Sequence, residues 1–284
     1  MSGNDQTHNH FVSTEWLAAH LNDADVTILD ASWYLPTMNR DPKAEYAAGH
    51  IPGAVYFDID AVADHTTTLP HMLPTPHDFA EIVGRMGISE ADHLVIYDGA
   101  GLFSAPRVWW TFKVMGAKRV SILQGGAPKW QAESRPWTDA VPAKTIKMFK
   151  PNFNSQNVAT LETVKAALET RQSQIVDARP ANRFRGEAPE PRPGLAQGHM
   201  PGSFNVQFGE IVADGSLKST HDMRQAFLNA GVDLDKPIIT SCGSGVSAAI
   251  LALALDSLGH PIKALYDGSW AEWGSRADCA VVKD

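Results

Sequence analysis

The sequence predicts an α/β protein made of two tandem copies of one domain, each a mainly parallel β-sheet flanked by helices. Two pairs of matching segments indicate the duplication: residues 49–54 (GHIPGA) return as 198–203 (GHMPGS), and residues 28–31 (ILDA) return as 175–178 (IVDA). The period of about 145 residues is the size of a domain rather than of a solenoid repeat. Each half also alternates short β-rich runs with helical patterns, which is typical of parallel sheets joined by helices.

The order of the expected elements places a boundary near the middle of the chain. Ser13 and Thr160 each stand before a helical pattern and are expected to cap it, so both halves begin in the same way. The segment between the halves holds Pro142 and Pro151 and has no clear hydrophobic period, which indicates a linker. We therefore expect an N-terminal domain over residues 1–140, a linker over 141–157 and a C-terminal domain over 158–284.

The two halves differ at the loop that follows one buried strand. When residues 94–99 (LVIYDG) are aligned with 237–243 (PIITSCG) on their glycine, Asp98 takes the place of Cys242. Of these two loops only the second carries a nucleophile. We therefore expect the N-terminal domain to be non-catalytic and the C-terminal domain to be catalytic.

Cys242 stands where a reactive thiol can be stabilised. The apolar run 237–240 leads into it and the apolar run 248–258 leads out, an order that indicates strand, tight loop and helix. Loop amides and a helix N-terminus both stabilise a thiolate. The alternative is a small buried cysteine that packs as a hydrophobe. The glycines and hydroxyls beside Cys242 favour a loop shaped to hold a ligand.

Composition excludes several classes of function. The 284 residues are 44% hydrophobic with a net charge of -8 at pH 7, which argues against nucleic acid or an anionic membrane as the main partner. No apolar stretch is long enough to span a membrane, and residues 1–10 lack a signal core. Two cysteines, Cys242 and Cys279, fit the reducing cytoplasm better than a disulfide framework. Without zinc-site spacing, GxGxxG or a P-loop, neither a metal nor a cofactor is expected.

Insertions distinguish the two halves further. The first half has five more residues than the second between its GH motif and the aligned loop, in the region of residues 64–74. The second half has two more between its strand-ending Asp177 and its GH motif, within residues 183–194. Insertions in a duplicated scaffold fall in loops, and loops tend to carry function.

The second insertion is rich in arginine and proline. Its arginines are Arg183, Arg185 and Arg192. A guanidinium group matches the geometry of a carboxylate or a sulfur oxyanion, so these residues are candidates for substrate binding. The alternatives are a role in surface solubility or pairing with Glu187 and Glu190, and Arg185 could also pair with Asp177 in a structural role.

Three further residues are candidates for proton transfer. His71 lies between prolines in the first insertion, where it is either a solvated surface residue or a group that tunes protonation. Asp60, eleven residues earlier, could orient it. Ser244 could donate a hydrogen bond to a sulfur or an oxyanion, or else bond within its own turn.

Together these segments resemble the two-domain rhodanese family over nearly the whole chain, from about Phe11 onward. The GH motifs are similar to its repeat motifs, and residues 267–274 (DGSWAEWG) are similar to its C-terminal signature. Residues 242–248 (CGSGVSA) resemble the active loop of 3-mercaptopyruvate sulfurtransferases, especially bacterial ones. Thiosulfate-preferring members usually carry basic residues after the cysteine, where this chain has Gly243 and Ser244.

The resemblance implies a role for each candidate. Cys242 would carry the transferred sulfur as a persulfide, cradled by loop amides that include those of Gly243, Gly245, Val246 and Ser247. Arg183 and Arg192 would bind the substrate carboxylate. Asp60, His71 and Ser244 would form a proton relay.

The expected function is transfer of sulfur from 3-mercaptopyruvate to a thiol such as thioredoxin or a small thiol, or to cyanide, with release of pyruvate. The family suggests a monomer. One alternative is a thiosulfate sulfurtransferase, and another is a non-catalytic sulfur carrier. A cysteine phosphatase is disfavoured, because such enzymes need an arginine six residues after the cysteine, where this chain has Ala248.

Overall fold

The computed structural model describes residues 10–260 and 262–284 and divides the chain into two compact units. The first unit contains residues 11–155 together with 214–216. The second unit contains residues 156–213 and 217–284, with His10. Each unit is described separately below.

The first unit is built on a parallel sheet with the strand order β1-β5-β4-β2-β3. Its central strands are almost completely buried, as expected where helices cover both faces of a parallel sheet. The strands are β1 (Phe11–Val12), β2 (Val26–Asp30), β3 (Val55–Tyr56), β4 (His93–Tyr97) and β5 (Arg119–Leu123).

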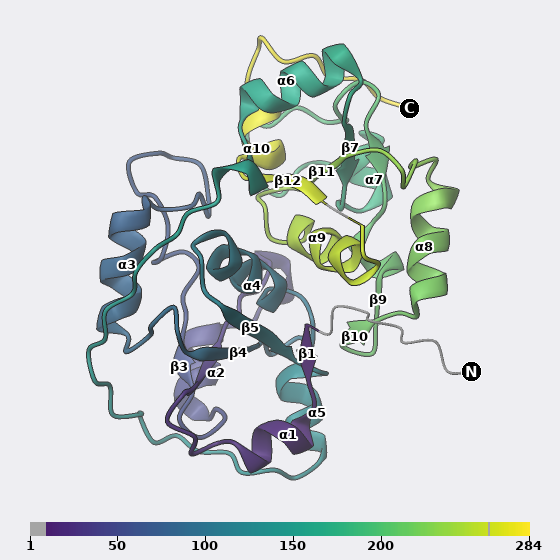
Figure 1. Cartoon of the computed structure of the whole chain (residues 1–284). Helices are drawn as coiled ribbons and strands as arrows, with labels where there is room; N and C mark the ends of the chain where they lie inside the picture. The colour runs from purple at the N-terminus through teal and green to yellow at the C-terminus, as the bar shows by residue number, and fades with distance from the viewer. Residues whose placement is uncertain (1–9, 261) are drawn as a thin grey trace. The chain divides into compact units, whose positions relative to one another are not determined.

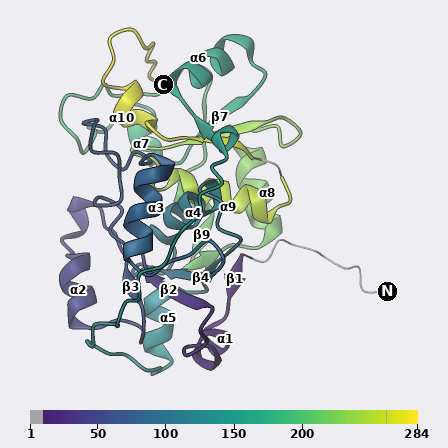
Figure 2. The ribbon, with the colours of Figure 1, turned by 60° about the vertical axis from the view of Figure 1, so that its left-hand side comes forward.

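Helices cover both faces of this sheet. They are α1 (Thr14–Ala19), α2 (Pro42–Ala48), α3 (Pro76–Arg85), α4 (Ala105–Val114) and α5 (Gly126–Ala132). The helices α1 and α5 lie next to each other on one face, where Leu17 and Trp130 pack against Val95 of β4 (Figures 1 and 2). The Ser13 side chain accepts a hydrogen bond from the Trp16 amide at the start of α1, which confirms the predicted cap.

Aromatic side chains connect the helices of the other face. Phe79 of α3 lies 5.2 Å from Phe112 of α4, ring centre to ring centre, and Phe112 lies 5.4 Å from Phe57. Phe149 joins this cluster at 5.4 Å from Phe79 and is 3% exposed. Phe149 belongs to the stretch 141–154, which forms neither helix nor strand. The residues expected to form the linker are thus anchored to the first unit through this side chain.

The second unit repeats the first. Its sheet has the order β6-β12-β11-β7-β8, which is the order of the first sheet when each strand is replaced by its equivalent. The strands are β6 (Val158–Ala159), β7 (Gln174–Asp177), β8 (Phe204–Asn205), β11 (Ile238–Ser241) and β12 (Ile262–Tyr266), all paired in parallel. This confirms the predicted fold class of two tandem α/β domains.

The helices of the second unit follow the same plan. They are α6 (Leu161–Thr170), α7 (Ala181–Phe184), α8 (Thr220–Asn229), α9 (Ala248–Ser257) and α10 (Ser269–Trp273). The Thr160 hydroxyl accepts a hydrogen bond from the Thr163 amide, so the second predicted cap is also confirmed. A short two-stranded sheet, β9 (Val212–Ala213) with β10 (Ser216–Leu217), precedes α8.

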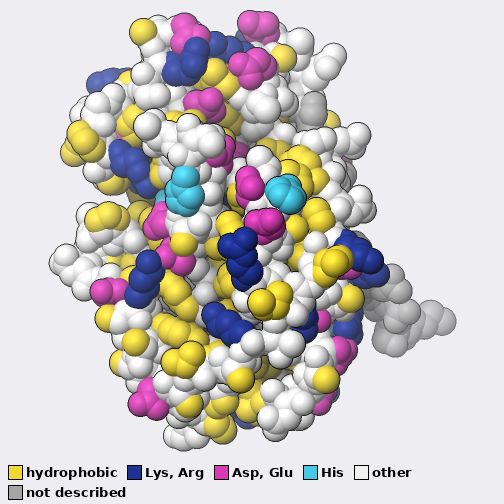
Figure 3. Space-filling view, turned by 90° about the vertical axis from the view of Figure 1, so that its left-hand side faces the viewer, with side chains coloured by type: hydrophobic (Ala, Val, Ile, Leu, Met, Phe, Trp, Pro, Cys, Tyr) yellow, Lys and Arg dark blue, Asp and Glu magenta, His cyan; other side chains and the backbone are white. Residues whose placement is uncertain are grey.

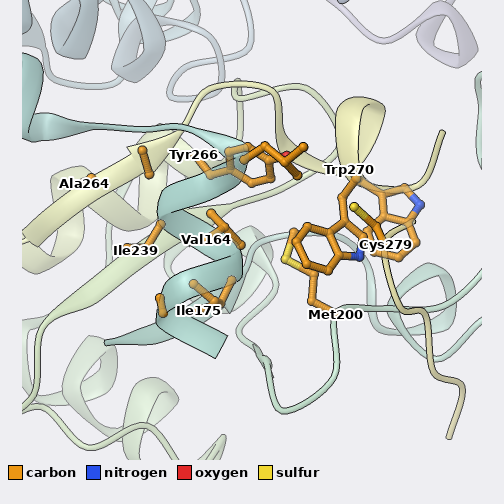
Figure 4. Packing of buried hydrophobic residues seen from close by; sticks show 12 residues of the cluster. Val164, Ile175, Met200, Ile239, Ala264, Tyr266, Trp270 and Cys279 are labelled. Carbon is orange, nitrogen blue, oxygen red and sulfur yellow. The ribbon is translucent and has the colours of Figure 1, made fainter. Parts of the chain in front are cut away.

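A buried cluster lies between α6, α10 and the second sheet (Figure 4). Val164 of α6 and Trp270 of α10 pack there with Ile239 of β11. Cys279 belongs to this cluster and is 7% exposed. Burial raises the pKa of the Cys279 thiol, which keeps it protonated and poorly nucleophilic near neutral pH.

The surface carries mixed charges. On the face shown in Figure 3, Lys and Arg side chains are scattered among Asp and Glu rather than gathered into one basic patch. Within the described residues no helix has the length and apolarity needed to cross a membrane.

Burial of Asp30 leads to a prediction about stability and pH. Asp30 ends β2, is 4% exposed, and burial raises the pKa of its carboxyl group above the ordinary value. Below the ordinary pKa this carboxyl is protonated in both the folded and the unfolded chain. As the pH rises, the unfolded chain loses its proton first, so the contribution of Asp30 to stability falls.

Asp30→Asn should therefore become more stable than the natural protein as the pH rises from 4 to 7. Urea unfolding midpoints at several pH values measure the difference. Asp139→Asn, at an exposed carboxylate, is the matched control and should show no such trend. A difference between Asp30→Asn and the natural protein that stays constant with pH contradicts the prediction.

Candidate active site

The loop that begins at Cys242 follows the central strand β11. In the second sheet Asp177 pairs with Ser241, and in the first sheet Asp30 pairs with Tyr97 in the same way. The next residues are Cys242 and Asp98. The two residues therefore hold equivalent positions, each at the carboxyl end of a central parallel strand, the edge where ligands bind in sheets of this type.

Backbone and side-chain hydrogen bonds hold Cys242 from the side of α10. Its amide donates to the Ser269 hydroxyl at 3.2 Å, and that hydroxyl donates to the Tyr266 carbonyl at 2.8 Å. The Cys242 carbonyl accepts from the Trp270 amide at 2.9 Å. Ser269 has a φ of 49°, a left-handed conformation uncommon for serine. These contacts fix the backbone of Cys242, whose side chain lies in a buried environment at 2% exposure.

The rest of the loop turns sharply into helix α9. Gly245 has a φ of 80°, a conformation that glycine adopts without steric cost. Ser247 precedes α9 and makes no side-chain capping bond, so the first amides of the helix are not capped by that hydroxyl. Ser244 and Val246 are buried, at 6% and 3% exposure. The N-terminus of α9 thus adds its positive dipole end to the loop.

The equivalent loop of the first unit shows what such a loop binds. The Asp98 carboxylate is fully buried, and one of its oxygens accepts three amide hydrogen bonds, at 2.7 to 2.9 Å, from Phe103, Ser104 and Ala105. These amides lie at the N-terminus of α4, as those of residues 246–248 lie at the N-terminus of α9. By this equivalence, the second loop is suited to hold a negative charge attached to Cys242.

Arg183 lies beside the backbone of the Cys242 loop. A Cβ atom added at Gly243 would stand 3.1 Å from Arg183 Nη2. The guanidinium is also bound by Glu190, with Nη2 to Oε2 at 2.5 Å and Nε to Oε1 at 3.3 Å. The expected alternative of pairing with Glu190 is therefore realised, and Arg183 still lies close to the residue that follows the cysteine.

Arg179, which binds the same Glu190 carboxylate as Arg183, is a buried residue that the sequence reasoning missed. It is 1% exposed, binds both Asp177 carboxylate oxygens through Nε at 3.2 and 2.9 Å, and stacks over Trp270 at 4.1 Å. Burial opposes its charge, but the carboxylates of Asp177 and Glu190 outweigh burial and raise the pKa of Arg179. The sequence feature that could have identified Arg179 is its position two residues after the strand-ending Asp177.

The structure corrects the suggestion that Arg185 pairs with Asp177. Arg179 holds that place, and Arg185 instead binds Glu187, with Nη2 to Oε2 at 2.8 Å. Both side chains of this second pair are largely exposed. Arg185 directly follows α7 and its side chain is 42% exposed, whereas Asp177 is buried. Arg192, later in the same loop, is half-buried.

In the first unit, Asp60 and His71 form a pair. The distance from His71 Nδ1 to Asp60 Oδ1 is 2.8 Å, and the Trp33 indole donates to the other Asp60 oxygen at 3.0 Å. His71 is buried, with a φ of 60°, and its carbonyl accepts from Arg107 at 2.5 Å. The alternative that His71 is a solvated surface residue is therefore wrong. Asp60 holds the imidazole through Nδ1, which fixes the ring orientation.

Comparison with known proteins adds an independent line of evidence. Residues 13–133 and 160–276 each match the rhodanese-like domain family. A 3-mercaptopyruvate sulfurtransferase of Escherichia coli strain K12 is 46% identical over 272 residues, covering 95% of this chain and 97% of the relative. A thiosulfate sulfurtransferase of Rattus norvegicus is 42% identical over 274 residues, covering 94% of this chain and 92% of the relative.

A solved structure matches the architecture as well. The crystal structure of SseA from Escherichia coli, described as having the rhodanese fold of 3-mercaptopyruvate sulfotransferases, has a TM-score of 0.83 with this chain at 43% identity. The match covers 92% of this chain and 99% of that structure.

Proposed function

Because this chain belongs to the rhodanese family, with two copies of the domain, we propose that it is a sulfurtransferase that takes sulfur from 3-mercaptopyruvate and releases pyruvate. The observation that carries the proposal is Cys242 on its loop. The residues after it, Gly243 and Ser244, are small and uncharged, and the guanidinium of Arg183 lies next to Gly243. This combination suits a donor with one carboxylate.

The reaction proceeds in two stages. The Cys242 thiolate attacks the sulfur of 3-mercaptopyruvate, a new sulfur–sulfur bond forms, and the carbon–sulfur bond breaks. Its electron pair passes to the pyruvate fragment as an enolate, which then takes a proton. Arg183 and Arg192 bind the carboxylate and orient the donor. A second thiol, or cyanide, removes the outer sulfur and returns the Cys242 thiolate, so the kinetics are ping-pong.

The persulfide intermediate carries a negative charge that the loop stabilises. The supporting observation is the first unit, where three amides bind the Asp98 carboxylate at the equivalent position. Amides of the second loop, including those of Gly243, Gly245, Val246 and Ser247, take the corresponding role for the persulfide.

The domain assignment forms part of the proposal. Residues 1–140 form a non-catalytic domain with Asp98 in place of the nucleophile, 141–157 link the two, and 158–284 form the catalytic domain. The side chain of Asp98 supports the first point, because a buried carboxylate bonded to three amides cannot attack a donor sulfur.

Protonation of the enolate is assigned to Asp60, His71 and Ser244. The support is the Asp60–His71 pair, whose geometry fixes the imidazole ring. His71→Gln should slow pyruvate release from 3-mercaptopyruvate about 10²-fold or more, the usual contribution of general acid catalysis. Persulfide formation from thiosulfate should change little. The leaving group is then sulfite, which needs no protonation at carbon.

Two rates measured on one sample test this assignment: pyruvate release from 3-mercaptopyruvate, and loss of sulfite from thiosulfate. His65→Gln, in the same loop and exposed, is the matched control and should leave both rates near those of the natural protein. An equal loss of both rates in His71→Gln would point to a structural role and remove the relay from the mechanism.

The acceptor, location and assembly are part of the same proposal. The acceptor is a thiol such as thioredoxin or a small thiol, the enzyme acts in the cytoplasm, and it is a monomer. The chain has two cysteines, and both are free and buried, which supports a reducing compartment. Size-exclusion chromatography with light scattering tests the monomer.

The decisive experiment compares the two donors. Pyruvate release from 3-mercaptopyruvate should exceed thiocyanate formation from thiosulfate and cyanide in kcat/KM. Thiosulfate is the second candidate donor, since one relative is named for it. A kcat/KM that favours thiosulfate would replace the proposed donor, and absence of both products would indicate a non-catalytic carrier.

A further inference from the structure

We propose that Glu190 determines donor specificity: its buried carboxylate makes the enzyme prefer a monoanionic mercapto-acid to a dianionic sulfur oxyanion. The inference rests on the proposed function, because it concerns what selects the donor of that reaction. It starts from the unusual place of this side chain, which is only 2% exposed although it belongs to a loop rich in charged residues.

Glu190 lies between two guanidinium groups. Its Oε1 is 2.8 Å from Arg179 Nη1, and its Oε2 is 2.5 Å from Arg183 Nη2. Its Oε1 also accepts from Arg183 Nε at 3.3 Å. A carboxylate bound on both sides in this way costs much to bury unless both partners stay charged, so the arrangement is held together as a unit.

The charges of this unit cancel. Arg179 is itself bound to Asp177, with Nη2 to Oδ2 at 2.8 Å, and both of these side chains are almost fully buried. Two guanidinium groups and two carboxylates therefore stand together. Arg183, which lies beside Gly243, offers hydrogen-bond donors without a large excess of positive charge around it.

Because Glu190 makes this set neutral, the set does not favour the donor with the higher negative charge. The 3-mercaptopyruvate ion carries one negative charge near neutral pH, and thiosulfate carries two. The Glu190 carboxylate repels both, and the repulsion is proportional to the charge of the donor. Removing this one negative charge should therefore favour thiosulfate over 3-mercaptopyruvate.

A second pair in the same loop provides a control. Arg185 binds Glu187 with two hydrogen bonds, at 2.9 and 2.8 Å, much as Arg183 binds Glu190. The side chains of this pair are 42% and 51% exposed, so water and salt screen their charges. The same substitution at Glu187 changes the net charge equally without changing the buried set.

The experiment measures kcat/KM for 3-mercaptopyruvate and for thiosulfate on the same sample, at fixed ionic strength, in Glu190→Gln, Glu190→Asp and Glu187→Gln. The ratio of the two values does not depend on the fraction of folded enzyme. In Glu190→Gln the ratio should shift toward thiosulfate by about tenfold, since a full charge is removed from a poorly screened position. In Glu190→Asp, which keeps the charge, and in Glu187→Gln the ratio should stay within about twofold of the natural protein.

Three other outcomes of this experiment would contradict the proposed role of Glu190. An unchanged ratio in Glu190→Gln, with both rates reduced equally, shows that Glu190 only supports the fold, and the proposal fails. If the kcat/KM ratio shifts equally in Glu190→Gln and Glu190→Asp, the effect comes from side-chain shape rather than charge. If the ratio shifts equally in Glu190→Gln and Glu187→Gln, the effect comes from the net charge of the protein. Either result overturns the proposal. Failure of the proposed function is recognised separately, because the natural protein would then release no pyruvate from 3-mercaptopyruvate.

Discussion

Replacing Cys242 with serine should abolish sulfur transfer, with a loss of at least about 10⁴-fold in kcat. A serine hydroxyl cannot form the persulfide, and Cys242 is the thiol that follows β11 on the loop leading into α9. Mass spectrometry after incubation with 3-mercaptopyruvate should show one added sulfur atom on the natural protein and none on Cys242→Ser. The fold should be retained, because serine is close in volume to the buried cysteine that it replaces.

Cys279→Ser is the matched control. Its thiol lies in the core cluster, where burial raises its pKa, so this variant should still gain the sulfur atom and release pyruvate. Substantial turnover by Cys242→Ser, or a sulfur atom found on Cys279, would contradict the assignment of the nucleophile.

Replacing Arg183 with glutamine should mainly raise the KM for 3-mercaptopyruvate. A hydrogen bond to a charged group contributes roughly 1.5–3 kcal/mol, so we expect an increase of about 10- to 150-fold. The change in kcat should be smaller, since the carboxylate does not react. Steady-state measurement of pyruvate release over a wide range of donor concentrations separates the two constants.

Arg185→Gln tests whether any arginine of this loop would give the same effect. Arg185 is bound to the exposed Glu187 and should have a KM near that of the natural protein. Two results would oppose the carboxylate-binding role of Arg183: an unchanged KM in Arg183→Gln, or an equal rise in both variants.

The strand-ending aspartates show which features could be predicted from the sequence. Asp30 and Asp177 were matched from the sequence, and the sheets place them in equivalent registers. Their surroundings differ, because Asp30 bonds to Ser32 and Asp177 to Arg179. The residue two places later decides this difference, yet its direction into the core became visible only in the folded chain.

The arginine loop shows where the sequence reasoning stopped. Its composition allowed several pairings, and the choice between them depends on which side chains the fold buries. Glu190 is held between Arg179 and Arg183, and Arg185 is left to pair at the surface. A buried carboxylate must be compensated by charged groups or hydrogen-bond donors, whereas an exposed one is solvated by water, so burial selects the pairing.

The sequence by itself determined the duplication, the α/β class and the position of Cys242 between a buried strand and a helix, because these follow from periodicity and repetition along the chain. The tertiary structure decided the contacts within each unit: the hydrogen bond between Cys242 and Ser269, the burial of Glu190 between two arginines, and the Asp60–His71 pair. Such contacts join residues of different elements and loops, and their energies depend on burial and distance. Neither quantity exists until the chain is folded.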